Sequence, residues 1–182
     1  KTTDELVALT FTATATDADI PANTLIFSLA NGEAGQVPEG ASINPSTGEF
    51  TWIPTEAQGT GEYTFDVCVS DGSLSDCETI TVTVNEVNVA PVLGPIGNKT
   101  TDELVALTFT ATATDADIPV QTLVFSLAGE VPEGAAITAA GAFSWTPNEE
   151  QGPGEYTFDV CVSDGTLSDC ETITVTVNEV NM

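Results

Sequence analysis

The chain has 182 residues and carries 28 acidic side chains against 2 basic ones, with no histidine and a formal charge of −26. This balance argues against nucleic acid and anionic membranes as partners, because both bind through basic side chains. The mutual repulsion of so many carboxylates is relieved by divalent cations or by high salt. Two interpretations stay open: a solvated acidic surface adapted to salt, and acidic groups placed to bind cations.

Two long stretches of the sequence occur twice. The matching stretches are 1–21 with 99–119 and, apart from Ser73 becoming Thr166, 61–88 with 154–181. Internal repetition of this kind predicts tandem domains, each with its own small core. We expect repeat 1 over residues 1–88 and repeat 2 over residues 89–182, with the linker strand included in repeat 2.

Within each repeat, apolar residues alternate with threonine. In the stretch 10–16, Phe11 and Ala13 would face one side and the threonines the other, which is typical of a half-buried strand. Further strands are expected at 2–7, 25–29, 50–52, 63–69 and 79–84, and in repeat 2 at 92–96 and 100–105. About seven short strands per repeat, separated by Gly and Pro turns, predict an all-β fold of two tandem immunoglobulin-like Greek-key β-sandwiches.

The two tryptophans allow two interpretations. Trp52 and Trp145 could bind sugars, but they share strand parity with Phe50 and Phe143, which are expected in the core. Because aromatic side chains dominate sandwich cores, we expect both tryptophans to be buried.

The four cysteines form two identical pairs, Cys68 with Cys77 and Cys161 with Cys170. An even count at a repeated spacing predicts disulfides and an oxidising compartment, whereas the spacing does not fit zinc. A two-residue turn at 72–73 would place the first pair directly opposite on neighbouring strands. Both cysteines have the parity of the threonine face, so we expect a cross-strand disulfide on the outer surface. Two free thiols per repeat are the alternative.

Repeat 1 lacks the stretch APVLGPIGN that precedes Lys99, so its first strand segment is truncated. We therefore expect the chain to be an excerpt of a longer array. A neighbouring copy of the chain could also supply the missing strand by strand addition. Asn98 begins an N-x-T sequon and is a candidate glycosylation site. No apolar run is long enough to insert into a membrane, and no signal peptide is evident.

Acidic residues recur at the ends of the expected strands. One end of each sandwich would hold Asp17, Asp19 and Asp71, or Asp115, Asp117 and Asp164. The other end would hold Glu5 and Glu56, or Glu103 with Glu149 or Glu150. The linker adds Asn85, Glu86 and Asn88. Clustered carboxylates repel one another unless a cation bridges them, and flexible oxygen ligands suit Ca²⁺. Ordinary turn chemistry of aspartate is the alternative.

Three segments resemble parts of cadherin repeats: ATDADIPANTLIFSL, YTFDVCVSDG and NEVNVAP. The whole pattern is similar to the cadherin-like, immunoglobulin-like tandem repeats of large microbial surface and secreted proteins. The resemblance implies Ca²⁺ at the junctions between repeats, where it stiffens a stalk. The implied ligands of the complete junction are Glu5, Glu56, Asn85, Glu86, Asn88, Asp115, Asp117 and Asp164. A preceding repeat would use Asp17, Asp19 and Asp71, and a following one would use Glu103, Asn178, Glu179 and Asn181.

The linker departs from the cadherin pattern at three positions. Asn85 and Asn88 stand where cadherins have aspartate, and Val89 stands where they have asparagine, so the resemblance implies fewer or more weakly bound calcium ions at this junction.

No catalytic motif is present, since the chain has no histidine, nucleophile elbow or phosphate-binding loop. We expect a non-enzymatic, calcium-stiffened structural spacer of an extracellular adhesin, surface protein or fibre, with neighbouring repeats as partners. One alternative is a module of a secreted protein that binds polysaccharide or a cell-surface protein. The other is a filament subunit that assembles by strand addition.

Overall fold

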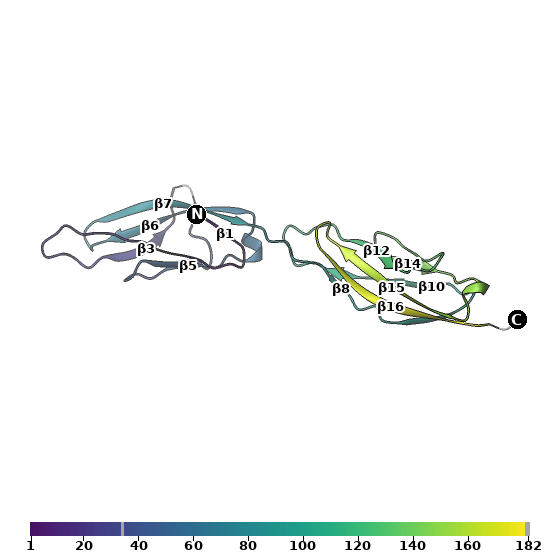
Figure 1. The fold of residues 1–182 in the computed structure, drawn as a ribbon. Helices are drawn as coiled ribbons and strands as arrows, with labels where there is room; N and C mark the ends of the chain where they lie inside the picture. Colours follow the sequence, from purple (N-terminus) through teal and green to yellow (C-terminus); the bar gives the residue numbers. More distant parts are fainter. Residues whose placement is uncertain (34, 181–182) are drawn as a thin grey trace. The chain divides into compact units, whose positions relative to one another are not determined.

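A computed structural model describes residues 1–33 and 35–180 (Figure 1). The chain forms two compact units, Lys1–Val87 and Asn88–Met182. This division lies one residue before the expected boundary at 88/89. No helix in the described part of the chain is long and apolar enough to cross a bilayer.

In the part of the first unit that the structure describes, seven strands form two sheets. Its elements are β1 (Thr2–Asp4), β2 (Leu9–Thr12), β3 (Ile26–Ala30), β4 (Ser42–Ile43), β5 (Glu49–Trp52), the 3-10 helix η1 (Glu56–Gln58), β6 (Gly61–Ser70) and β7 (Ser75–Asn85). One sheet has the order β1-β7-β6-β3 and the other β2-β5-β4. Only β1 and β7 run parallel, and the remaining pairs of this unit are antiparallel. This arrangement is the expected immunoglobulin-like sandwich.

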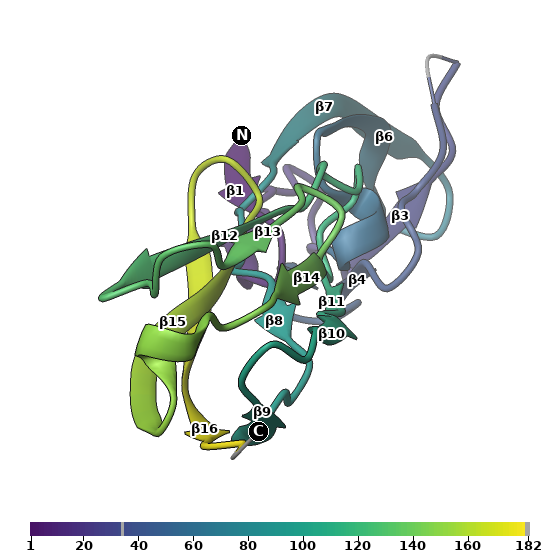
Figure 2. The same cartoon turned by 90° about the vertical axis from the view of Figure 1, so that its right-hand side faces the viewer.

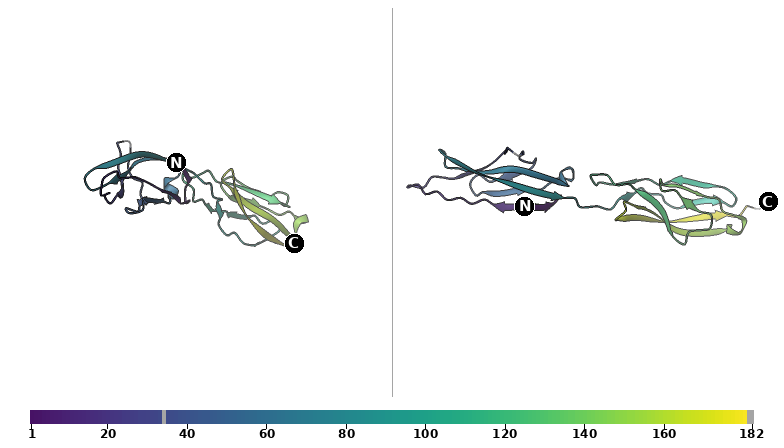
Figure 3. Two further views of the ribbon diagram at one scale, coloured as in Figure 1. Left: turned by 60° about the vertical axis from the view of Figure 1, so that its left-hand side comes forward. Right: turned by 90° about the horizontal axis from the view of Figure 1, so that it is seen from above.

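The second unit repeats these sheets and adds one strand pair (Figure 2). Its elements are β8 (Val92–Leu93), β9 (Lys99–Asp102), β10 (Leu107–Thr110), β11 (Ala113–Thr114), β12 (Val124–Gly129), β13 (Ala136–Ile137), β14 (Ala142–Trp145), the 3-10 helix η2 (Glu149–Gln151), β15 (Gly154–Ser163) and β16 (Ser168–Asn178). The main sheets are β12-β15-β16-β9 and β10-β14-β13, and the additional pair is β8 with β11. Figure 3 shows the strands of each unit from two further sides.

The core of each unit lies between its two sheets and is built around aromatic rings. Phe50 stacks on Phe11 with ring centroids 4.5 Å apart, and Trp52 meets Tyr63 edge-on at 4.9 Å. Trp52 is 1% exposed, and its indole nitrogen donates a hydrogen bond to the Glu39 carbonyl at 3.1 Å. The prediction of a buried tryptophan is therefore confirmed, since a buried indole needs such an acceptor. The same arrangement recurs around Trp145 in the second unit.

Several expected strands are shorter than the alternation predicted, and those expected at 2–7 and 100–105 end at Asp4 and Asp102. The strand expected at 10–16 ends at Thr12, just as its counterpart in the second unit ends at Thr110. Residues 13–16 pair with no strand in the described part of the first unit. Their counterparts in the second unit contain β11, which pairs with β8. The strand expected at 92–96 is only β8, since the following Gly-Pro sequence includes a proline that has no backbone N–H for a ladder.

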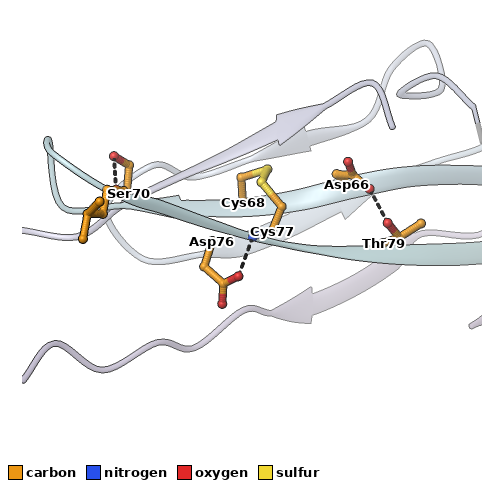
Figure 4. The surroundings of a disulfide bond; sticks show 7 residues. Asp66, Cys68, Ser70, Asp76, Cys77 and Thr79 are labelled. Carbon is orange, nitrogen blue, oxygen red and sulfur yellow. Dashed lines mark hydrogen bonds between the residues drawn. A yellow bond between two sulfur atoms is a disulfide. The ribbon is translucent and has the colours of Figure 1, made fainter. Parts of the chain in front are cut away.

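The long hairpin of each unit confirms the predicted register. Cys68 lies opposite Cys77, and Ser70 lies opposite Ser75, as a two-residue turn requires. The disulfide therefore joins neighbouring strands of one sheet (Figure 4). Cys77 is exposed, but Cys68 is only 8% exposed, so only the β7 half of the bridge lies at the surface. The second unit has the same bridge on β15 and β16.

Candidate metal centres

Among the residues 1–33 and 35–180, acidic side chains gather in four clusters. In each cluster, one ligand atom from each of three carboxylates lies within 4.8 Å of the others. We name them the first glutamate cluster (Glu5, Glu56, Glu86), the first aspartate cluster (Asp17, Asp19, Asp71), the second glutamate cluster (Glu103, Glu149, Glu179) and the second aspartate cluster (Asp115, Asp117, Asp164). The structure thus groups the predicted carboxylates, and it selects Glu149 over Glu150.

Glu5 is the most enclosed member of the first glutamate cluster. Strand β1 ends just before it, and its backbone N–H donates to the Asn85 carbonyl at 3.0 Å. The side chain is 1% exposed, and its Oε1 accepts a hydrogen bond from the Val87 backbone at 3.1 Å. Its Oε2 is buried without a hydrogen-bond partner. An unpaired buried carboxylate oxygen is costly, and a bound cation would offset this cost.

Gly59 makes room for this carboxylate. It follows η1, and a Cβ built on it would overlap Glu5 Oε2 and lie 2.8 Å from Glu86 Oε2. The φ of Gly59 is −61°, which any residue adopts, so the space beside the carboxylates explains this glycine better than backbone strain does. The sequence signal was a glycine directly after the acidic 3-10 turn, and sequence reasoning missed it.

The second glutamate cluster has the same construction. Glu103 is 1% exposed, its Oε1 accepts from the Val180 backbone at 2.9 Å, and its Oε2 is buried without a hydrogen-bond partner. A Cβ on Gly152 would overlap that Oε2. Asn181, which was expected beside this cluster, lies outside the described residues. Because the same arrangement of a buried glutamate beside a glycine occurs in both units, it is not a chance orientation of a single side chain.

The first aspartate cluster is built from two turns. Asp17 Oδ1 accepts from the Asp19 backbone at 2.7 Å, and Asn23 donates its backbone N–H to Asp17 Oδ2 at 3.2 Å. Asp71 Oδ1 accepts from the Leu74 and Ser73 backbones at 2.7 Å each. These two hydrogen bonds, the one from Leu74 foremost, hold the pKa of Asp71 below its ordinary value.

The second aspartate cluster is more enclosed. Asp117 is fully buried, and both of its oxygens accept from the Val89 backbone at 3.1 Å. Gln121 donates to Asp117 Oδ2 and to Asn88 Oδ1, both at 3.0 Å. Asp115 Oδ2 is buried without a hydrogen-bond partner. Gln121 stands where the first unit has Asn23, and its longer side chain reaches both groups.

Asn88 contacts the second aspartate cluster directly. Its side-chain amide donates to Asp164 Oδ2 at 2.8 Å. This bond, followed by those from the Leu167 and Thr166 backbones, lowers the pKa of Asp164. Asn85 behaves differently, because its amide donates to Asp4 Oδ1 at 2.9 Å and so joins β1 to β7.

Turn chemistry explains part of this acidic set. Asp17, Asp71 and Asp164 each accept backbone N–H groups of their own turns. It does not explain Glu5 and Glu103, whose buried Oε2 atoms face further carboxylates. Like charges at this separation destabilise the ionised forms unless a cation lies between them. Carboxylates with amide and carbonyl oxygens nearby form the donor set that Ca²⁺ prefers, so the residues fit this ion.

Asn98 is exposed, and its Oδ1 accepts a hydrogen bond from the Thr174 backbone at 2.9 Å. Glycosylation would modify its nitrogen rather than this oxygen. Its glycosylation stays a prediction.

Comparison with known proteins finds a family model in both units. The He_PIG model (Putative Ig domain) matches residues 1–85 and 90–178. Solved structures with a similar fold include mouse cadherin-23 EC22-24, at 21% identity and a TM-score of 0.53 over 86% of this chain and 53% of that one. Human protocadherin-24 EC1-2 matches at 17% identity and a TM-score of 0.55 over 90% of this chain and 85% of that one. Drosophila N-cadherin EC1-4 matches at 17% identity and a TM-score of 0.56 over 87% and 42% of the two chains.

One curated relative is an enzyme. Chitinase A of Pseudoalteromonas piscicida is 30% identical over 141 residues, which cover 76% of this chain. The match spans only 15% of the chitinase.

Proposed function

Because the chain belongs to the He_PIG family (Putative Ig domain), as two tandem copies, we propose that it is a calcium-binding, non-catalytic spacer of an extracellular protein. The observation that carries this proposal is the pair of glutamates, Glu5 and Glu103, each 1% exposed with an unpartnered Oε2 among further carboxylates. The two disulfides support an oxidising, extracellular setting.

Each glutamate cluster would hold the ion through its three carboxylates. When bound, Ca²⁺ supplies the positive charge that these side chains lack. The protein orients the ligands: the Val87 and Val180 backbones fix one oxygen of Glu5 and of Glu103, which leaves the other oxygen for the ion. The aspartate clusters add carboxylates whose lowered pKa values at Asp71 and Asp164 keep them ionised in mildly acidic solution.

The spacer role follows from the order of ligands along the chain. Glu86 belongs to the first glutamate cluster, and Asn88 contacts Asp164 of the second aspartate cluster. Only Val87 separates them in the sequence. Ions held at both clusters would therefore restrict the backbone on either side of Val87, and a tandem chain would become stiffer.

Calcium titration of the whole chain tests this proposal. Free calcium at 100 times its dissociation constant should stabilise the chain by roughly 2.7 kcal/mol, and EDTA should reverse the rise in Tm. Small-angle scattering should show a longer maximum dimension with calcium. Glu5→Gln and Glu103→Gln should each weaken binding, because they remove the enclosed ligand.

Glu62→Gln is the matched control, since Glu62 is exposed on β6 outside every cluster. A Tm that is the same in calcium and in EDTA would contradict the proposal. So would Glu5→Gln and Glu103→Gln variants that bind calcium as the control does.

The chitinase relative favours a second candidate, a module that binds polysaccharide in a secreted degrading enzyme. Such modules bind sugars on exposed aromatic rings, whereas Trp52 and Trp145 are 1% exposed. We therefore rank this function second. Retention of the chain on chitin or cellulose beads would reverse the ranking.

A further inference from the structure

Asp117 is the most enclosed carboxylate of the second aspartate cluster. Its side chain is fully buried, and both of its oxygens already accept hydrogen bonds. The Val89 backbone donates to Oδ1 and to Oδ2 at 3.1 Å each, and Gln121 Nε2 donates to Oδ2 at 3.0 Å. Hydrogen bonds to an ionised group stabilise its charge, so donors of the protein itself compensate this buried carboxylate.

Two side-chain amides of the second unit connect Asp117 with Asp164. Gln121 Nε2 donates to Asn88 Oδ1 at 3.0 Å as well as to Asp117 Oδ2. Asn88 Nδ2 donates in turn to Asp164 Oδ2 at 2.8 Å. We call the side chains of Asn88 and Gln121, together with these three hydrogen bonds, the amide bridge. It supplies an N–H donor to two of the three carboxylates in the cluster.

The direction of each hydrogen bond in the amide bridge follows from the carboxylates at its two ends. An ionised carboxylate accepts hydrogen bonds and cannot donate them. Asn88 must therefore turn its nitrogen toward Asp164 and its oxygen toward Gln121. Gln121 then faces two acceptors, Asn88 Oδ1 and Asp117 Oδ2, and only its nitrogen satisfies both. Turning either amide over would bring two acceptor oxygens together with no hydrogen between them.

The nitrogen of Gln121 lies where a cation could bridge two oxygens of the cluster. It is 3.0 Å from Asp117 Oδ2 and 3.0 Å from Asn88 Oδ1. Ca²⁺ binds protein oxygens at about 2.3–2.6 Å, so an ion that contacted both oxygens from this side would overlap the nitrogen. The two N–H groups also present the positive ends of their dipoles to these oxygens. The amide and a cation on this side therefore exclude each other.

One carboxylate oxygen of the second aspartate cluster lacks a donor in the described part of the chain. Asp115 Oδ1 accepts from the Asp117 backbone at 3.0 Å, but Asp115 Oδ2 is buried without a hydrogen-bond partner. The Oε1 of Gln121 is buried without a partner as well. A buried acceptor without a partner is costly, so the amide bridge compensates the cluster only in part. A cation that reached Asp115 would still be stabilised there.

We propose that the amide bridge is a built-in competitor for the cation of the second aspartate cluster. Gln121 holds Asp117 paired at low calcium, and calcium binds fully only after it displaces the Gln121 amide. The cluster therefore binds calcium more weakly than its three carboxylates would without the amide. This inference rests on the proposed function, and it adds how one of the proposed calcium sites is regulated.

Gln121→Met tests the competition, because methionine has nearly the length of glutamine and no N–H donor. Calcium titration of the whole chain can be followed by NMR at two backbone amides. Val89 reports on the second aspartate cluster, and Val87 reports on the first glutamate cluster. In the variant, the midpoint of the Val89 response should fall to about one tenth of its calcium concentration, because the hydrogen bond to a charged acceptor no longer has to be broken. The midpoint of the Val87 response should stay unchanged.

Two further readouts do not depend on the calcium affinity of the variant. In EDTA, Gln121→Met should have a lower Tm than the unchanged chain, because the buried Asp117 loses a donor. In the unchanged chain, calcium should shift the side-chain amide resonances of Gln121 as this group leaves Asp117. Gln36→Met makes the same substitution at an exposed glutamine and should alter neither the Tm nor either midpoint.

The outcomes separate this inference from the proposed function. A Val89 midpoint that is unchanged or higher in Gln121→Met would overturn the competition, and a higher one would make Gln121 a ligand of the ion instead. The proposed function survives that result as long as Val87 responds to calcium. Gln121 side-chain resonances that do not move with calcium, or an unaltered Tm in EDTA, would also contradict the amide bridge. A chain in which neither Val87 nor Val89 responds to calcium would refute both proposals.

Discussion

The two units have identical residues at most matching positions, and the centres of their two cores are packed alike. They differ at one end of the sandwich. The Phe109–Phe143 and Phe11–Phe50 stacks both have centroids 4.5 Å apart. Beside residues 92–98 of the second unit, however, Ile173 is fully buried, whereas its counterpart Ile80 in the first unit is only half-buried. The difference teaches that the segment 92–98, whose Leu93 and Ile96 pack against the second core, contributes to the burial of Ile173.

The largest expected effect is a difference in the loss of stability when Ile173 or its counterpart Ile80 is replaced by alanine. Ile173→Ala should cost about 2–5 kcal/mol, as for a fully buried aliphatic side chain. Ile80→Ala should cost clearly less, because Ile80 is only half-buried and its shortened side chain leaves no closed cavity. Hydrogen exchange under increasing denaturant can follow each unit, since peptides that contain Ser73 or Thr166 differ in mass. Equal costs would contradict this difference in burial between Ile173 and Ile80.

A smaller effect is expected at the two matching glutamates. Glu171→Gln should destabilise the second unit by about 1–3 kcal/mol, because Glu171 accepts two backbone hydrogen bonds from the segment. Glu78→Gln should stay within about 0.5 kcal/mol of the unchanged chain, since Glu78 is exposed. Denaturant unfolding of both variants at one calcium concentration provides the comparison. A cost at Glu78 as large as at Glu171 would contradict the assigned contacts.

Much of the fold could be predicted from the sequence, because it depends on local alternation. The alternation of threonine with apolar residues predicted the long strands, and the two-residue turn at 72–73 predicted the pairing of Cys68 with Cys77. The short strand β11 could not be predicted, since residues 113–114 form a strand only by pairing with β8, which comes from a separate segment. The alternation did contain a signal for the contacts of the segment 92–98: Asp169 and Glu171 continue the inward parity of Ile173, and they were not recognised as acceptors for its backbone N–H groups.

The sequence predicted which residues form the candidate sites, but it predicted their geometry only in part. The repeated positions grouped Glu5 with Glu56 and Glu86, and the structure brings their carboxylates together. The hydrogen bond from Asn85 to Asp4 could not be foreseen, because it depends on the parallel register of β1 and β7. The burial of Glu5 required the same register, together with the space at Gly59.

The smallest expected effect concerns the pKa of one carboxyl group. Asp71 and Asp164 lie in matching turns, but Asn88 donates a further hydrogen bond to Asp164, and both pKa values lie below the ordinary value. A depressed pKa contributes stability above about pH 4 that is lost as the pH falls through the folded value. Asn88→Ala in calcium-free buffer should raise the pKa of Asp164 and leave that of Asp71 unchanged, so the variant should lose less stability on acidification. Carboxyl chemical shifts measured by NMR against pH can test this, and an equal pKa change at Asp71 would mean that the substitution does not act through the hydrogen bond from Asn88 to Asp164.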